Sequence, residues 1–195
     1  GLYLGARMVP FVDIGHGGVA GLEDLGLIIA WIGGITAFMA AAIAFVQNDI
    51  KKVLAYSTMS QLAYIFTGLG AALFLLNIGE ESAGYFVLGA SMFHLFNHAM
   101  AKGMLFMASG SVVHELHHAH DHVRELSPKY SAHEGEDPFD FDPLDMRNMG
   151  GLAARMPVTA TAMMFGSMSI IGIPLIGGFW SKEGIIAETW AACLK

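Results

Sequence analysis

Long apolar runs separated by short polar stretches dominate this chain. A helix needs about 20 mostly apolar residues to cross a lipid bilayer. Four segments meet or approach that length, namely residues 25–46, 53–76, 84–114 and 158–194. Residues 1–11 resemble the end of a further segment of the same kind. The pattern predicts an all-α, polytopic transmembrane helix bundle.

The last of these segments is too long for one straight span, and glycine and proline interrupt it at Gly172-Ile173-Pro174 and Gly177-Gly178. Proline removes a backbone donor and clashes with the preceding turn, whereas glycine tolerates non-helical backbone. We therefore expect one discontinuous helix, a feature that lines ion sites in transporters. An ordinary loop between two short helices is the alternative.

The basic residues of the connections alternate from side to side. Lysine and arginine are absent from residues 8–24 and 77–83, whereas residues 48–52 hold two and residues 115–156 hold four. By the positive-inside rule, the turn at 48–52 and the segment 115–156 face the cytoplasm. We treat 115–156 as a histidine- and acid-rich loop within a single transmembrane domain that spans residues 1–195.

Composition supports a membrane protein. Hydrophobic residues make up 54% of the chain and charged residues 14%, against about 25% charged in soluble domains. Nine of the seventeen acidic residues lie between Glu115 and Asp145, so the net charge of −7 is mostly a property of one loop. A soluble helical protein is the alternative, but residues 25–46 lack the polar face that it needs.

The first residues of the chain resemble the end of a helix, and the last residues resemble a helix that is cut short. No signal-peptide pattern opens the sequence. We therefore expect an internal part of a longer protein. Cys193 is the only cysteine, so no internal disulfide can form.

Three ionisable residues in segment 84–114 are spaced four apart: His94, His98 and Lys102. This spacing places them on one helical face, and that face must point to other helices or to water because charge facing lipid is costly. Desolvation disfavours the charged form of a lysine, and histidines one turn apart can pass protons. The stripe predicts a proton relay; histidines that only bond neighbouring helices are the alternative.

Other polar clusters carry weaker predictions. Lys182 and Glu183 directly follow the predicted break and are assigned to the proton path, with an interfacial lysine as the alternative. Tyr56, Ser57, Ser60, Gln61 and Tyr64 could wet a half-channel, but hydrogen bonds between helices are the preferred interpretation. The stretch HELHHAHDH at 114–122 has metal-binding residue types; without cysteine, we predict a solvated loop and no metal site.

Three stretches together resemble one family: FVQNDIKKVLAYSTMSQLAYIFTGLG (45–70), HLFNHAMAKGMLFMASGSVVH (94–114), and DMRNMGGLAARMPVT followed by GIPLIGGFWSKEGII (145–186). Their order and spacing are similar to those of the antiporter-like proton-translocating subunits of respiratory complex I. The similarity is greatest to subunit L of the bacterial NADH:quinone oxidoreductase.

The resemblance implies a role for each matching residue. Lys102 matches the central lysine of the second half-channel, and His94 and His98 match histidines that link charges along the membrane midplane. Lys182 matches the terminal lysine on the broken helix, and Glu183 stands where subunit L usually has aspartate.

The resemblance also implies a setting. The protein would lie in the bacterial inner membrane as a multi-pass subunit, beside other complex I membrane subunits that include sister antiporter-like subunits. It would contact the lipid bilayer and no nucleic acid. NADH, FMN, iron–sulfur clusters and quinone would be bound by other subunits, because this chain has no cysteine cluster and no glycine-rich nucleotide loop.

Two other functions stay open. A subunit of an Mrp-type Na⁺/H⁺ antiporter, or a membrane subunit of a related hydrogenase, shares the lysines and the broken helix. A purely structural membrane scaffold is the third possibility; it predicts that Lys102 tolerates replacement by leucine, against the cost of a buried charge.

Overall fold

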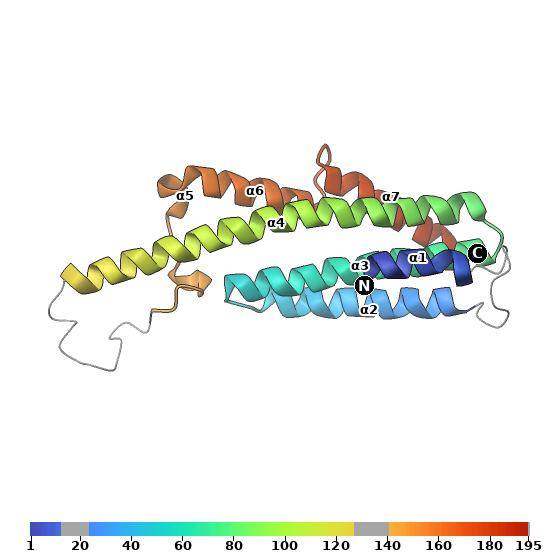
Figure 1. Cartoon of the computed structure of the whole chain (residues 1–195), viewed down its shortest axis with the longest axis horizontal. Helices are drawn as coiled ribbons and strands as arrows, with labels where there is room; N and C mark the ends of the chain where they lie inside the picture. The colour runs from blue at the N-terminus through green and yellow to red at the C-terminus, as the bar shows by residue number, and fades with distance from the viewer. Residues whose placement is uncertain (13–23, 127–140, 195) are drawn as a thin grey trace.

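The protein is an elongated bundle of helices (Figure 1). A computed structural model describes residues 1–12, 24–126 and 141–194, and within these ranges it contains helices and no strands. The elements are α1 (Leu2–Val12), α2 (Leu25–Phe45), α3 (Ile50–Asn77), α4 (Glu81–Leu126), the 3-10 helix η2 (Met146–Asn148), α5 (Leu152–Arg155), α6 (Pro157–Ile171) and α7 (Gly177–Cys193). The predicted all-α architecture is confirmed.

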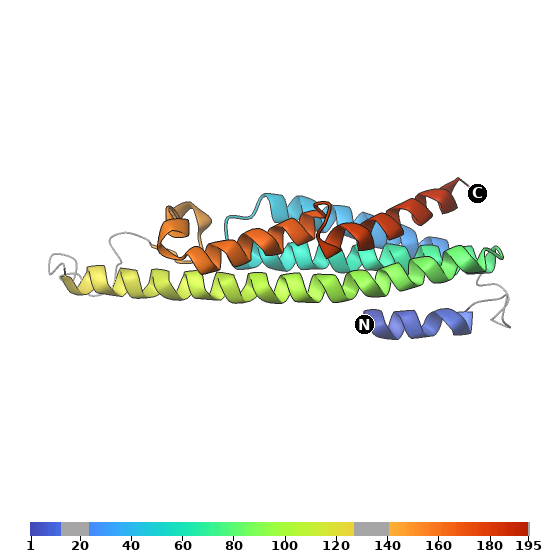
Figure 2. The same ribbon diagram turned by 90° about the horizontal axis from the view of Figure 1, so that it is seen from above.

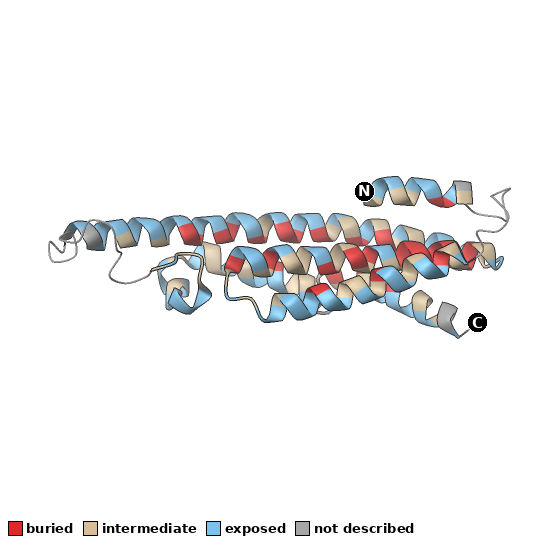
Figure 3. Cartoon of the chain, turned by 90° about the horizontal axis from the view of Figure 1, so that it is seen from below, coloured by how far each residue is buried: buried red, intermediate tan, exposed pale blue. Residues whose placement is uncertain are grey.

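The helices differ in how well they suit a bilayer. By length and apolarity, α2 and α3 can each cross a membrane. Only 11% of the apolar stretch of α2 is buried within the chain, against 61% for α3, so α3 forms the centre of the bundle (Figure 3). The described α4 is long enough, but the polar residues in its middle lower its hydropathy; α6 is a shorter apolar helix.

The long helix α4 corrects one prediction. It runs for 46 residues, which corresponds to about 69 Å at 1.5 Å per residue and exceeds a hydrocarbon core of about 30 Å. Residues 115–126 belong to this helix, whereas we expected a loop from Glu115 onward. The dense charge was misleading: residues 111–126 contain neither glycine nor proline to end a helix. Residues 127–140 of the predicted loop lie outside the described ranges.

The turn between α2 and α3 lies against the segment that follows α4. The Asp49 carboxylate caps α3 by accepting hydrogen bonds from the backbone N–H groups of Lys51 (2.8 Å) and Lys52 (3.2 Å). The Ile50 N–H donates to the Leu144 carbonyl (3.0 Å), and the Met146 N–H to the Asn48 carbonyl (2.9 Å). The two connections rich in basic residues thus lie at the same end of the bundle, as their charges predict.

The predicted break divides the last segment into α6 and α7. Gly172 adopts φ +83°, which ends α6, and Leu175 adopts φ +84° before α7 begins at Gly177. Gly178 lies against the Ser169 carbonyl so closely that no β-carbon fits. The short connection projects from the bundle where the two helices meet (Figure 1), and Figure 2 shows α6 and α7 following one another alongside α4. The discontinuous helix is therefore present.

Candidate functional site

The polar face of α4 points into the bundle. His94, His98 and Lys102 are 3%, 6% and 5% exposed, and Ser91 on the same stripe is fully buried. Figure 1 shows α4 between α2 and α3 on one side and α6 and α7 on the other, so protein surrounds this face. The structure thus places the three predicted residues together and away from the exterior of the chain.

Lys102 binds neutral oxygen atoms on α3. Its Nζ donates to the Leu54 carbonyl (3.1 Å) and to the Ser57 hydroxyl. Ser57 also donates to the Leu54 carbonyl (3.1 Å), so the three groups form one small cluster. No ion pair seen within residues 1–12, 24–126 and 141–194 involves Lys102. A lysine held by neutral acceptors is not locked into its charged form by a carboxylate.

His94 is bonded through both ring nitrogens. Its Nδ1 lies 2.8 Å from Ser181 Oγ on α7, and its Nε2 lies 3.0 Å from Gln61 Oε1 on α3. The Tyr64 ring meets the imidazole edge-on, with centroids 5.4 Å apart. These contacts fix the ring between α3 and α7.

His98 stacks one turn farther along α4, with its ring centroid 6.4 Å from that of His94. Its Nε2 is buried and has no hydrogen-bond partner in the part of the protein that the structure describes. A cavity of about 10 Å³ lies between His94, His98 and residues 169–170. That volume is about the minimum for one water molecule, so the site can connect His98 to its neighbours by water.

Lys182 lies across the break in the last helix. Its Nζ donates to the Ile170 carbonyl in the last turn of α6, and its own carbonyl accepts from the Tyr64 hydroxyl (2.9 Å). The Asn97 side chain donates to the Gly177 carbonyl (3.0 Å). Tyr64 and Asn97 thus attach the start of α7 to α3 and α4.

Glu183 lies apart from this cluster. Its side chain is exposed, and no ion pair of the described ranges joins it to Lys182. Its place in the proton path rests on its position directly after the break and on the resemblance.

Several members of the site were not singled out from the sequence. Ser181 and Asn97 were missed, although Asn97 lies three residues after His94 and spacing alone could have indicated it. Gln61, Tyr64 and Ser57 were interpreted as bonds between helices. They do bond neighbouring helices, but their partners are site residues. Ser60 bonds the Ala37 carbonyl of α2 (2.8 Å), as that interpretation predicts.

The histidines of 114–122 lie on the exposed end of α4 rather than in a loop. The rings of His114 and His118 meet with centroids 4.5 Å apart. No group of three or more metal-ligating side chains is assembled within the described residues.

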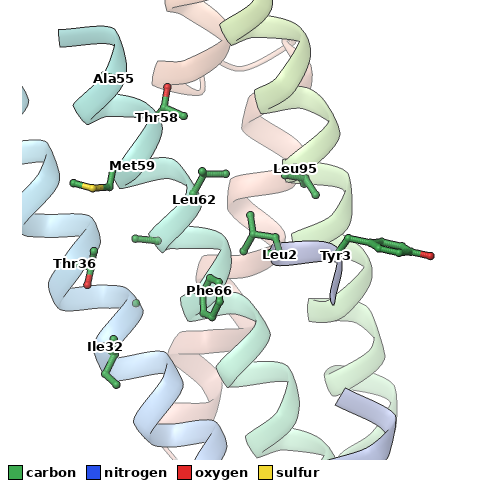
Figure 4. A pocket seen from close by; sticks show the side chains of 13 residues that line it. Leu2, Tyr3, Ile32, Thr36, Ala55, Thr58, Met59, Leu62, Phe66 and Leu95 are labelled. Carbon is green, nitrogen blue, oxygen red and sulfur yellow. The ribbon is translucent and has the colours of Figure 1, made fainter. Parts of the chain in front are cut away.

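A large apolar cavity lies on another side of the bundle. It measures about 890 Å³ and is lined mainly by α1, α2 and α3. Figure 4 shows Leu62 and Phe66 of α3 and Leu95 of α4 facing it. None of the predicted proton-path residues lines this cavity, so the candidate site is the polar cluster between α3, α4 and α7.

Comparison with known proteins gives one consistent result. A family model described as NADH:quinone oxidoreductase/Mrp antiporter, TM, matches residues 1–194. NAD(P)H-quinone oxidoreductase chain 5 of Picosynechococcus sp. is 40% identical over 192 residues, covering 98% of this chain and 23% of the relative. Chain 5 of Synechocystis sp. is 40% identical over 195 residues, with the same coverage.

A chloroplastic relative agrees. NAD(P)H-quinone oxidoreductase subunit 5 of Anthoceros angustus is 38% identical over 190 residues, which cover 97% of this chain and 21% of the relative. The chain therefore spans between a fifth and a quarter of the length of these curated relatives.

Proposed function

This chain belongs to the NADH:quinone oxidoreductase/Mrp antiporter transmembrane family, and from that membership we propose that it is part of a proton-translocating membrane subunit of an NADH:quinone oxidoreductase. Protons would move through a lysine–histidine relay on this chain. Quinone reduction elsewhere in the complex would drive them, with NADH, FMN, iron–sulfur clusters and quinone on other subunits. The chain itself carries out no redox chemistry.

The observation that carries the proposal is a series of polar groups inside the bundle, of which His94, His98 and Lys102 are buried and Lys182 is half-buried. It begins at Lys102 beside α3, continues along α4 through His98 and His94, and ends at Lys182 beside the broken helix. Four residues of α4, about 6 Å along the helix axis, separate successive members of the first three. Burying such groups at membrane depth is costly and usually serves ion movement.

The direction of the path follows from the loop charges. Lys102 bonds Leu54 and Ser57 in the second and third turns of α3, at the end of that helix that begins at the turn 48–52, which the positive-inside rule places in the cytoplasm. Protons would enter there, reach Lys102, pass His98 and His94, and leave through Lys182, with Glu183 next to the exit.

The relatives favour this function over its main alternative. The family model covers both quinone oxidoreductases and Mrp antiporters, whereas the relatives described above carry the name quinone oxidoreductase. We propose other membrane subunits of the complex, including sister antiporter-like subunits, as partners, and the bacterial inner membrane as the location.

The test uses the full-length protein in its assembled complex in sealed vesicles. NADH-driven acidification per electron is recorded for wild type, Lys102→Ala and Lys51→Ala, with and without Na⁺. Lys51 is an exposed lysine of the same end of the bundle and serves as the matched control. We expect Lys102→Ala to lose translocation, Lys51→Ala to keep it, and Na⁺ to have no effect.

Other results would replace the proposal. Proton movement driven by an imposed Na⁺ gradient, without any response to NADH, would establish the antiporter. Full activity in Lys102→Leu would establish the scaffold. His98→Ala should slow translocation less than Lys102→Ala does, and equal losses would contradict the order of the relay.

A further inference from the structure

Ser181 supplies the hydroxyl that is hydrogen-bonded to the ring of His94. It lies in the second turn of α7, its side chain is fully buried, and its Oγ lies 2.8 Å from His94 Nδ1. The same oxygen lies 3.2 Å from the Gly178 carbonyl and 3.4 Å from the Gly177 carbonyl. One hydroxyl hydrogen therefore has two kinds of acceptor: an imidazole nitrogen and the carbonyls of its own helix.

Gln61 determines which nitrogen of the neutral ring carries the proton. The Gln61 Oε1 atom faces His94 Nε2 at 3.0 Å, and an amide oxygen only accepts hydrogen bonds. Neutral His94 therefore carries its proton on Nε2 and donates it to Gln61. Its Nδ1 presents a lone pair, which accepts the hydroxyl hydrogen of Ser181.

A second ring proton reverses the bond to Ser181. Protonated Nδ1 donates to Ser181 Oγ, and the hydroxyl hydrogen turns to the Gly178 carbonyl. One proton is added, both imidazole N–H groups keep an acceptor, and no heavy atom has to move. A buried imidazolium without that second acceptor would be costly, because unpaired buried polar groups lose their hydration.

We propose that Ser181 is a positioning residue that lets His94 alternate between its neutral and doubly protonated forms by rotation of one hydroxyl. This inference rests on the proposed relay function. Ser181 links the histidines of α4 to the first turns of α7, in which Lys182 directly follows Ser181. The Tyr64 and His98 rings lie against that of His94, and the Tyr64 hydroxyl bonds the Lys182 carbonyl, so the ring lies between other members of the path.

Ser109 supplies the matched comparison. It is 1% exposed in α4, and its hydroxyl donates to the Phe106 carbonyl three residues earlier (2.9 Å), just as Ser181 can donate to Gly178. Within the described residues, this hydrogen bond to its own helix is the one that its side chain makes. A serine that merely satisfies its hydroxyl within a helix should behave like Ser109.

The experiment measures NADH-driven proton translocation by the assembled complex in sealed vesicles, in H₂O and in D₂O. We expect Ser181→Ala to slow translocation about tenfold, which corresponds to about 1.4 kcal/mol, the low end for a hydrogen bond to a charged group. The ratio of the H₂O to the D₂O rate should rise, because proton transfer at His94 becomes limiting. Ser109→Ala should change neither quantity.

An isosteric pair separates the hydroxyl from its volume. Ser181→Thr should retain translocation and Ser181→Val should lose it, because the two side chains share a shape and differ in the hydroxyl. If the extra methyl group prevents assembly, Ser181→Cys against Ser181→Ala makes the same comparison, with the weak hydrogen bonding of a thiol giving an intermediate rate.

Three results would overturn the inference: a Ser181→Ala variant that matches Ser109→Ala, a loss with no change in the isotope ratio, or equal losses in the threonine and valine variants. The function of the chain is tested separately. If wild type translocates protons and His94→Ala is slower, the relay stands even where Ser181 proves dispensable.

Discussion

The contact between α2 and α3 yields a prediction about the frame that holds the site. These two helices meet at glycines, where their backbones touch. A methyl group on Gly70 would lie closest to the Ala30 backbone nitrogen, then 2.6 Å from the Gly26 carbonyl oxygen and 2.9 Å from the Ala30 Cα. Real contacts of this kind lie at 3.4–4 Å, so Gly70→Ala requires the helices to separate by more than about 0.8 Å, the difference between 3.4 Å and the 2.6 Å to the Gly26 oxygen. Backbone atoms cannot rotate away as a side chain can.

The size of the effect follows from two opposing contributions. Overfilling a packed interface costs about 1–3 kcal/mol, and this site belongs at the upper end because both neighbours are backbone atoms. Against this cost, alanine stabilises a helix by up to about 1 kcal/mol relative to glycine. Gly70→Ala should therefore lower the free energy of unfolding by about 1–2 kcal/mol. Gly89→Ala in α4, where no atom lies within 4 Å of the new methyl group, should raise it by about 0.5–1 kcal/mol.

The assay is thermal unfolding of the two variants and the wild type in the same detergent–lipid mixture. The prediction is a difference of about 1.5–3 kcal/mol between the variants, obtained from the sum of the two opposite changes. Equal stability of Gly70→Ala and Gly89→Ala would refute the close approach of α2 and α3. Because α3 carries the partners of Lys102 and His94, Gly70→Ala should also slow proton translocation.

Three further predictions concern the site and its surroundings. Tyr64→Phe removes the hydrogen bond to the Lys182 carbonyl. A neutral hydrogen bond contributes about 1 kcal/mol, so proton translocation should slow about fivefold while the complex stays intact. Unchanged rates would show that this bond does not position Lys182. Gly172→Ala forces alanine to φ +83°, so stability measured by thermal unfolding should fall by about 1–2 kcal/mol. The Arg147 side chain, through its hydrogen bonds, holds the pKa of Asp145 below its usual range. The stabilisation from the Asp145–Arg147 pair is therefore fully present above the ordinary carboxyl pKa of about 4. It is lost as the pH falls through the lowered pKa of Asp145. Asp145→Asn should speed limited proteolysis near η2 at pH 7, and the difference from wild type should narrow in acid.

Much of the local structure was predictable from the sequence. Apolar length indicated α2 and α3, glycine and proline indicated the break at 172–176, and the four-residue spacing placed His94, His98 and Lys102 on one face. Each of these is a local property, set by hydropathy, backbone freedom or the helical repeat. The extent of α4 was missed because its charged end resembles a loop in composition although nothing in it stops a helix.

The partners of the relay could not be predicted in the same way. The helical repeat by itself determined that three ionisable side chains share a face, and the cost of burying charge indicated that the face is covered. Only the packing of α3 and α7 against α4 decided that His94 meets Gln61 and Ser181, the latter 87 positions away along the chain. Contacts at that separation depend on how whole helices pack, which residue spacing within one helix does not encode. The same packing left Glu183 on the exposed side of α7, one residue from the buried cluster.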